Sequence, residues 1–466
     1  MLLNNHPKRD TFGVFDAQLV DRYFKKSKFS TFISFRRRNK RRSSSMRRNN
    51  DYKIFETKLG GKVYFDIDNK MPKIERSHPD NLMGEPKCDC CPPAMSGHRL
   101  AIVGNYAYVY GGLCEKRDED GFHISTDLWR LRLIDNTWKR IPLKDEAYYF
   151  APVSYAWIAT KKWGLLTFGG TGFPFGVTIN DKLCRLYIKN TKDGCEYNVV
   201  PLQSYGSSPL ATYGGALIAD EEHDCIYYVG GTNGHEYYSD VYRGDFLPFG
   251  ETSKVYWTLL TSHCFGVAGR YRHEIVLHNN KILMFGGGNA DTLYSVNNIT
   301  YFDLEENNFG VLNTSPDPIH KFPPKRDCFS LIRFDDLVFL MGGRATPDGR
   351  TLLDDIWCLD LSTFIWHKNS MKLSFRTAFQ ASAVDDNGRV YVFGGHRGSS
   401  SSQPIHIGRT NMIQSFIASP PSLKSICQRF IAQRYKKGIS LSDKAVYSPE
   451  MFVKEILPHY NAIKVK

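Results

Sequence analysis

Hydrophobic and polar positions along this chain repeat in a pattern that predicts strands. Six short runs of β-branched, aromatic and other apolar residues each end in a pair of glycines, as Val390-Tyr391-Val392-Phe393 does before Gly394-Gly395. The other five pairs are Gly111-Gly112, Gly169-Gly170, Gly230-Gly231, Gly286-Gly287 and Gly342-Gly343. Successive pairs are 58, 61, 56, 56 and 52 residues apart. Self-similarity at a nearly constant period indicates a repeat architecture.

The second half of the repeat recurs as well. In three repeats an acid or an amide stands 11 residues before an aromatic residue. These pairs are Asp127 and Trp138, Asn298 and Phe309, and Asp355 and Trp366. Each repeat therefore predicts a four-stranded sheet, in which the second strand ends at the glycine pair and the outer strand carries the aromatic residue. Glycine permits a tight turn with positive φ, and flat aromatic side chains fill the wedge between neighbouring sheets.

The paired glycines and spaced aromatics resemble the kelch motif. The resemblance implies an all-β fold, a six-bladed kelch propeller over residues 96–418, whose radial closure protects the strand edges. The sixth repeat is irregular, because its third strand, expected near Pro404–Ile407, carries no Trp. Two alternatives remain for completing this repeat. Met412–Phe416 forms its outer strand, or a hairpin predicted within residues 52–67 closes the ring, and we favour the hairpin. Residues 51–95 then form this hairpin and a linker.

Charge is concentrated at the two ends of the chain. Of the net charge of +13, residues 1–50 carry +11 and residues 420–466 carry +6, which leaves −4 for the residues between them. The basic block Arg36–Arg48 repels itself and predicts a disordered tail. The tail is either simply solvated or a nuclear-localisation or RNA-binding patch. The central part of the chain is mildly acidic, so we expect nucleic acid as a partner only through the basic tail.

The beginning of the chain lacks a signal-peptide pattern, and no apolar run approaches 18 residues. We therefore expect a protein of the cytoplasm or nucleus, or both, without a membrane partner. The 11 cysteines are an odd number, which predicts free thiols. The cluster Cys88–Cys91 lacks the second ligand pair that a zinc site needs, so no metal is expected.

No enzyme signature is present, and we expect neither catalysis nor a cofactor. The candidate chemistry is an arginine cluster instead. Arg270 and Arg326 stand 16 residues before their glycine pairs. Arg376 stands 18 residues before its own pair, but the hairpin predicted between them is about two residues longer, so the three positions are expected to be equivalent. Three convergent guanidinium groups predict an acidic ligand, because unpaired cations are costly to bury. Alternatively, each arginine pairs with a local acid such as Asp327. The candidate ligand-binding residues are Arg270, Arg272, His273, Arg326 and Arg376, with Tyr271 as a further candidate.

The segment 419–466 predicts helices. Leu423, Cys427 and Ile431 recur at i, i+4 and i+8, on one stripe of a helix. The run resembles a BC box, which implies binding to Elongin C through these three residues. A second predicted helix ends at Leu457-Pro458 and resembles a partial cullin box, which favours Cullin-2 over Cullin-5. The alternative is a helix that packs on the underside of the propeller.

The whole layout is similar to that of the kelch domain-containing protein 10 family and of kelch substrate receptors of Cullin-2–Elongin ubiquitin ligases. This resemblance implies an adaptor with Elongin B/C and Cullin-2 as partners. Such an adaptor would present proteins with C-terminal degrons, and its arginines would bind the terminal carboxylate. The alternatives are a kelch scaffold in signalling, through regulation of a Ser/Thr phosphatase, or an actin-binding protein, both without a ligase role.

Overall fold

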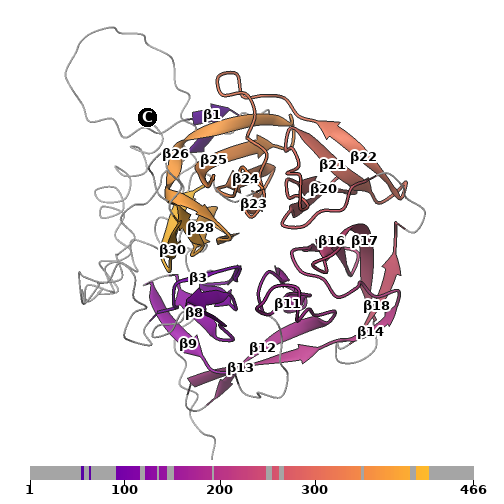
Figure 1. Cartoon of the computed structure of the whole chain (residues 1–466), viewed down its shortest axis with the longest axis vertical. Helices are drawn as coiled ribbons and strands as arrows, with labels where there is room; N and C mark the ends of the chain where they lie inside the picture. Colours follow the sequence, from indigo (N-terminus) through magenta and orange to yellow (C-terminus); the bar gives the residue numbers. More distant parts are fainter. Residues whose placement is uncertain are drawn as a thin grey trace, which may run out of the picture. The chain divides into compact units, whose positions relative to one another are not determined.

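The computed structural model describes residues 54–56, 62–64, 91–115, 121–133, 136–143, 152–191, 194–247, 254–261, 267–347, 351–398 and 406–418. Within these ranges the regular secondary structure consists of β-strands, and the sheets are arranged radially (Figure 1). This confirms the predicted all-β, propeller-type fold. The basic tail 1–50 and the predicted helical segment 419–466 lie outside the described residues. No helix long and apolar enough to cross a bilayer occurs in the described part of the chain.

Five of the six repeats contain an antiparallel arrangement of four strands, which is extended by further strands in the third and fifth sheets. The first sheet consists of β4 (Arg99–Val103), β5 (Tyr106–Tyr110), β8 (Leu128–Arg132) and β9 (Thr137–Ile141). The second consists of β10 (Ala156–Thr160), β11 (Gly164–Phe168), β12 (Leu183–Thr191) and β13 (Gly194–Pro201). The third consists of β15 (Ala216–Asp220), β16 (Cys225–Thr232), β17 (Tyr237–Phe246) and β18 (Lys254–Leu259), with β14 (Gln203–Gly206) added in parallel outside β18.

The fourth sheet consists of β19 (Glu274–His278), β20 (Lys281–Phe285), β21 (Asn298–Asp303) and β22 (Asn308–Asn313). The fifth consists of β23 (Ser330–Phe334), β24 (Leu337–Met341), β25 (Leu353–Asp360) and β26 (Ile365–Ala378), and continues through β29 (His396–Gly398) and β30 (His406–Arg409). The sixth consists of β27 (Ala381–Val384), β28 (Arg389–Phe393) and β31 (Ile413–Ile417). Two small sheets are formed by β3 (Met95–Ser96), β6 (Leu113–Glu115) and β7 (Phe122–Ile124), and by β1 (Ile54–Glu56) and β2 (Lys62–Tyr64).

Aromatic side chains fill the space between neighbouring sheets. Trp366 of the fifth sheet is fully buried, and its ring centre lies 6.4 Å from that of Phe285 in the fourth sheet. Its indole Nε1 donates a hydrogen bond to Thr314 Oγ1 at 3.0 Å, so the polar tip of the ring is also satisfied. Truncation of such a side chain to alanine costs about 3–5 kcal/mol.

The second glycine of each pair links its own sheet to the next repeat. Its N–H donates to a carbonyl oxygen of that repeat at 2.8–2.9 Å. The six acceptors, in chain order of the donors, are Pro152, Thr212, Arg270, Arg326, Thr377 and Met95. The last bond, from Gly395 to Met95, returns to the first repeat, so the series closes on itself. The first glycine of a pair also lies against this carbonyl, because a Cβ on Gly169 (φ +70°) would lie 2.3 Å from Thr212 O.

A second closed series lies two residues beyond each of these acceptors. The six residues here all have positive φ, between 53° and 70°, and we call them the hexad: Gly97, Ser154, Gly214, Arg272, Cys328 and Phe379. The N–H of each donates to the carbonyl of the hexad member in the neighbouring repeat, at 2.7–3.4 Å, and Gly97 donates to Phe379 to complete the cycle. Two of the six are glycines, whereas Arg272 and Phe379 are bulky residues held in the left-handed region.

Met95 contributes contacts that close the ring among the described residues. The strand Ile413–Ile417, which overlaps the alternative expected over Met412–Phe416, pairs with β28 as the third strand of the sixth sheet. Met95 donates to Thr410 O at 3.2 Å and accepts from Gly395. In the described residues, β1 pairs with β2 in a sheet of two strands. Among the described residues, the closing contacts therefore come from the segment around Met95, and closure by the 52–67 hairpin stays a prediction.

Candidate ligand-binding site

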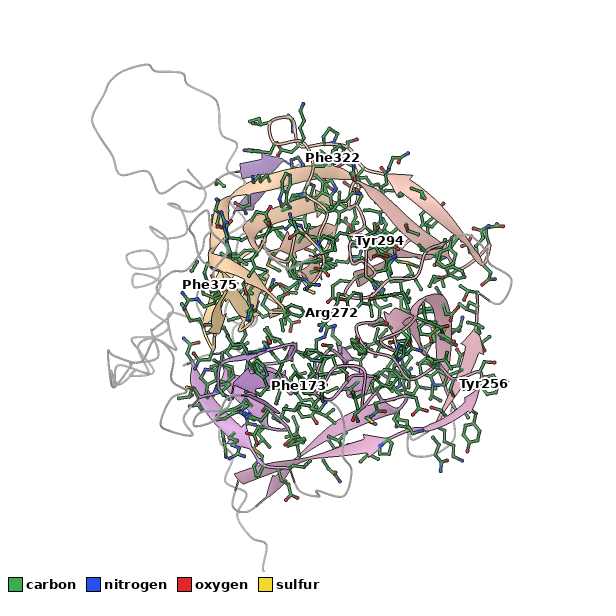
Figure 2. The ribbon with its side chains drawn as sticks, viewed as in Figure 1. Phe173, Tyr256, Arg272, Tyr294, Phe322 and Phe375 are labelled. Carbon is green, nitrogen blue, oxygen red and sulfur yellow. The ribbon has the colours of Figure 1, made fainter. Side chains whose placement is uncertain are left out.

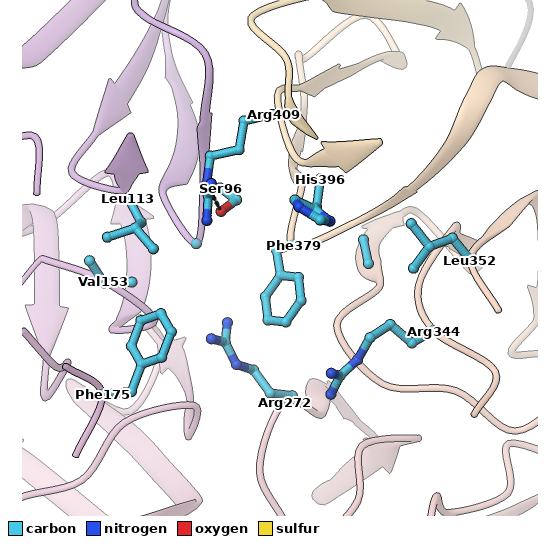
Figure 3. Close-up of a pocket in the computed structure, with 12 residues that line it drawn as sticks. Ser96, Leu113, Val153, Phe175, Arg272, Arg344, Leu352, Phe379, His396 and Arg409 are labelled. Atoms are coloured by element: carbon cyan, nitrogen blue, oxygen red, sulfur yellow. Dashed lines mark hydrogen bonds between the residues drawn. The ribbon is translucent and has the colours of Figure 1, made fainter. Parts of the chain in front are cut away.

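A cavity of about 270 Å³ opens beside the hexad (Figure 3). Its walls come from five of the six repeats, because residues far apart in the chain meet where the inner loops converge. The lining residues are Ser96, Gly97, Leu113, Val153, Phe175, Arg272, Arg344, Leu352, Ala378, Phe379, His396 and Arg409. The lining thus combines apolar side chains with three guanidinium groups and one imidazole, and no lining residue is acidic. Such a lining suits a small anion attached to an apolar or uncharged group.

Arg272 lies toward the centre of the ring of sheets (Figure 2). Its Nη2 donates to Ser154 Oγ, and its Cζ lies 4.6 Å from the ring centre of Phe379. The buried Nε of Arg272 has no hydrogen-bond partner, and Arg272 forms no ion pair with a carboxylate of the described residues. Burial lowers the pKa of Arg272, because the charged form loses solvation there. The site therefore presents a cation with unused donor capacity.

Arg344 lines the cavity next to Arg272 but has a counter-ion. Its Nε donates to Oδ1 of buried Asp327 at 2.8 Å, and its Nη2 pairs with Oδ2 of the same carboxylate. The pair raises the pKa of Arg344 against the opposing effect of burial. Its Cζ also lies 5.1 Å from the ring centre of Phe379. Arg344 is therefore held firmly, with its charge largely balanced.

Arg409 borders the cavity from the sixth repeat. Its Nε donates to Ser96 Oγ at 2.9 Å, and its Cζ lies 4.5 Å from the ring centre of Phe122. Phe122 and Phe173 are 5.4 Å apart, and Phe173 and Phe175 are 5.6 Å apart, measured between ring centres. The three rings are 37–48% exposed, and Phe175 also lines the cavity. An exposed apolar strip, formed by Phe122, Phe173 and Phe175, thus leads away from the cavity.

Of the residues proposed from the sequence, only Arg272 lines this cavity. Arg326 is fully buried and forms a two-bond ion pair with Asp355, at 2.6 Å and 3.0 Å. Its Nη1 also donates to Gly342 O at 2.9 Å. Although burial acts to raise the pKa of Asp355, the Arg326 charge lowers it. Arg326 therefore braces the fifth sheet, as the alternative interpretation expected, but through Asp355 and not through Asp327.

Arg270 is also buried away from the cavity. It is 4% exposed, its Nη2 donates to Thr300 Oγ1 at 3.0 Å, and its Cζ lies 4.5 Å from the ring centre of Tyr294. Burial lowers its pKa to about 10. Tyr294 supplies a cation–π contact in place of an ion pair. Arg270 and Arg326 thus occupy equivalent positions, as the spacing predicted, but their side chains do not converge on one ligand.

His273 occupies a position that supports the contact between neighbouring repeats. At the equivalent position of three other repeats, a side chain bonds the carbonyl that precedes a glycine pair. These bonds are His98 Nε2 to Phe393 O (3.1 Å), Tyr155 OH to Tyr110 O (2.7 Å) and Gln380 Nε2 to Met341 O (2.9 Å). His273 is 1% exposed, and burial lowers its pKa to about 3. It is therefore neutral near pH 7, and it occupies the position from which the other three side chains bond a neighbouring repeat.

Arg376 is one residue out of register with the other two arginines. The acceptor of the Gly343 N–H is Thr377, which is fully buried in β26. Adjacent residues of a strand point to opposite faces, so Arg376 points away from the position that Thr377 occupies. The sixth repeat is longer by one residue at this point, whereas the alignment by spacing assumed two.

The sequence analysis did not identify Arg344 and His396 as site residues, although their position relative to the glycine pairs indicates them. Both directly follow a glycine pair, at the place that Leu113 takes in the first repeat, and all three line the cavity. Comparing the residues after the pairs would have identified this side of the site. Arg409 has no such signal, because it lies in the irregular part of the sixth repeat.

Comparisons with known proteins agree with this architecture. A family model described as the KLHDC2/KLHL20/DRC7 Kelch-repeats domain matches residues 158–395. Kelch domain-containing protein 10 of Rattus norvegicus is 30% identical over 313 residues, which cover 65% of this chain and 72% of the relative. The Homo sapiens protein of that name is 31% identical over 313 residues, covering 65% and 66%. The Kelch domain-containing protein 10 homolog of Drosophila melanogaster is 29% identical over 373 residues, covering 76% and 59%.

Proposed function

The chain belongs to the kelch-repeat family, and from this premise we propose that it is a non-enzymatic interaction protein that binds the C-terminal carboxylate of partner proteins in the arginine-lined cavity. We further propose that it serves as a substrate receptor of a Cullin-2–Elongin ubiquitin ligase. The closed series of hydrogen bonds from the six glycine pairs supports a propeller of six blades, one for each pair.

The observation that carries the binding proposal is the state of Arg272. Its guanidinium group faces the cavity, lacks a carboxylate partner among the described residues and keeps an unused Nε donor. An arginine fork matches the geometry of a carboxylate, and each charge-assisted hydrogen bond contributes roughly 1.5–3 kcal/mol. A chain terminus is the carboxylate that a cavity of about 270 Å³ can accept together with small flanking groups.

The ligase proposal depends on residues 419–466, which lie outside the described residues. Leu423, Cys427 and Ile431 are the proposed contacts to Elongin C, and Leu457-Pro458 the proposed contact to Cullin-2. Support comes from the match of these positions to the BC-box and cullin-box patterns in a kelch-repeat protein. The last strand of the sixth sheet ends at Ile417, and the N–H of the next residue, Ala418, donates to Gly388 O at 2.7 Å, so this segment follows directly in the chain after the sixth sheet.

The carboxylate proposal is tested with fluorescein-labelled decapeptides that end in glycine and have nine randomised positions, prepared as free acids and as C-terminal amides. We expect the full-length chain to retain the free acids selectively. Arg272→Gln should weaken retention roughly 10- to 150-fold, the equivalent of one charge-assisted hydrogen bond. Arg243→Gln is the matched control, because Arg243 pairs with Asp245 on the partly exposed β17 and does not line the cavity. Equal retention of acids and amides would refute carboxylate recognition and favour a general kelch scaffold.

The ligase proposal is tested by co-purification of the full-length chain with Elongin B/C. Leu423→Ala combined with Cys427→Ala should abolish the complex while leaving peptide binding intact, since the cavity and the segment are separate parts of the chain. Co-purification that is unchanged by the double substitution, or absent with the unmodified chain, would refute the receptor role and leave the cavity proposal standing.

A further inference from the structure

Phe379 is a bulky residue in a backbone conformation that favours glycine. Its φ is +59°, and it belongs to the hexad, where two of the six repeats use glycine. We propose that Phe379 is a positioning residue that aims the guanidinium groups of Arg272 and Arg344 into the cavity and so determines its selectivity for an oxyanion. This inference rests on the proposed carboxylate-binding role of the same cavity.

The Phe379 ring contacts both cations. The Cζ atoms of Arg272 and Arg344 lie 4.6 Å and 5.1 Å from the ring centre, and Figure 3 shows the ring next to both guanidinium groups. The face of an aromatic ring is negative, so it attracts both cations at once. One side chain thereby contacts both cations and adds no acid to the lining of the cavity.

The hexad explains why the ring points into the cavity. The Phe379 N–H donates to Cys328 O at 2.8 Å, and its carbonyl accepts from Gly97 N at 3.0 Å. These two bonds hold the backbone in the left-handed region, while Ala378 and Leu352 pack beside the ring. Since Gly97 and Gly214 meet the same backbone requirement without strain, the ring closure itself does not require phenylalanine.

Arg272 depends on this contact more than Arg344 does. Arg344 is also held by its bonds to Asp327, which do not involve residue 379. Among the described residues, the Arg272 side chain donates a hydrogen bond to Ser154 Oγ, and its Nε has no partner. Removal of the aromatic face should therefore release Arg272 first, and the cavity would keep its charge but lose the fixed direction of the fork.

The test compares Phe379→Leu, Phe379→Tyr and Phe379→Gly in the full-length chain. Leucine keeps an apolar side chain and the backbone conformation but removes the aromatic face, whereas tyrosine keeps that face. With the free-acid decapeptides, we expect about tenfold weaker binding for Phe379→Leu and for Phe379→Gly and no change for Phe379→Tyr. Glycine tolerates the left-handed conformation, so Phe379→Gly keeps the test valid if Phe379→Leu does not fold.

The control is Cys328→Gly, which relieves the same backbone conformation in the neighbouring repeat at a residue that does not line the cavity. Its peptide binding should equal that of the unmodified chain. Equal binding by Phe379→Leu, Phe379→Gly and the unmodified chain would overturn the proposal. So would equal weakening by Cys328→Gly, because a general disturbance of the hexad would then explain the loss.

A second measurement does not require a peptide ligand. The arginine-selective reagent phenylglyoxal, followed by mass spectrometry of proteolytic fragments, reports how freely Arg272 reacts. We expect modification of Arg272 to be several times faster in Phe379→Leu and unchanged in Phe379→Tyr. If no peptide binds the unmodified chain, the proposed function fails, but this measurement still decides the role of Phe379. An unchanged rate in Phe379→Leu would refute it.

Discussion

Substitution of Asp355 by asparagine should destabilise the protein strongly, because it leaves a buried cation unpaired. Arg326 is 0% exposed and directs two hydrogen bonds to the Asp355 carboxylate, at 2.6 Å and 3.0 Å. The same carboxylate accepts the Trp357 Nε1 hydrogen bond at 2.7 Å. Breaking a buried pair by removing one charge costs about 3–5 kcal/mol. Equilibrium urea unfolding followed by tryptophan fluorescence should show this loss directly, since Trp357 adjoins the pair.

Two comparisons separate the pair from its surroundings. Asp245→Asn breaks the partly exposed pair with Arg243 and should cost less than about 1 kcal/mol. The double substitution Arg326→Met with Asp355→Leu removes both charges and should recover much of the loss. A loss below about 1 kcal/mol for Asp355→Asn would refute the argument that Arg326 depends on this carboxylate. Such a result would return Arg326 to the list of free ligand-binding candidates.

The pH dependence of the same pair has a definite sign. The Arg326 charge lowers the pKa of Asp355 in the folded protein below its value in the unfolded chain. A carboxyl group of this kind stabilises the fold at pH values above its unfolded pKa, near 3.9. The contribution is lost as the pH falls through the folded pKa. The unfolding free energy of the unmodified chain should therefore fall below about pH 4 more steeply than that of Asp355→Asn.

Three further outcomes follow from particular residues. Asp317 accepts backbone N–H bonds from Ile319, His320 and Lys368 that, against the opposing effect of burial, lower its pKa to about 2; Asp317→Asn should therefore cost about 2 kcal/mol at pH 7 in urea unfolding and progressively less as the pH falls through 2. Gly169→Ala should lower the thermal unfolding midpoint much more than Gly104→Ala, because its Cβ meets Thr212 O at 2.3 Å whereas that of Gly104 meets nothing within 4 Å; equal shifts would show that φ alone decides. Phe173→Ser should weaken binding of the randomised free-acid peptides severalfold without a change in unfolding free energy, since the ring is 45% exposed; unchanged binding would exclude the exposed apolar strip from the interface.

The sequence predicted the elements of the fold well where the pattern is local. The run Val338–Met341 before Gly342-Gly343 lies in β24, and Asp355-Ile356-Trp357 lies in β25. Both were predictable because alternation of apolar residues and glycine pairs are signals that extend over only a few residues. The equivalence of Arg270 and Arg326, and of His98 and His273, was also visible from spacing alone. In each of these cases the nearest glycine pair provides the reference for counting.

The site was predicted only in part. Arg272 was identified as a neighbour of the cluster, but Arg344 and Arg409 were missed and Arg326 was assigned to the ligand. Its carboxylate partner, Asp355, lies 29 residues further along the chain. Asp327, the adjacent acid, pairs with Arg344 instead. Spacing places a backbone position on the ring, but the direction of a long side chain depends on which of several acids it meets.

The amino-acid sequence by itself determined the all-β repeat, the places where the sheets turn and the glycines on which close approach depends, because these follow from backbone sterics and short-range periodicity. Only the tertiary structure decided which arginine faces the cavity, since that depends on contacts between segments such as Phe379 and Arg272, which lie 107 positions apart in the chain. It also decided the register of the sixth repeat, where a single residue separates Arg376 from the buried position of Thr377. A one-residue offset in a strand reverses the face of a side chain, and the hydrogen bond from Gly343 N to Thr377 O establishes that offset.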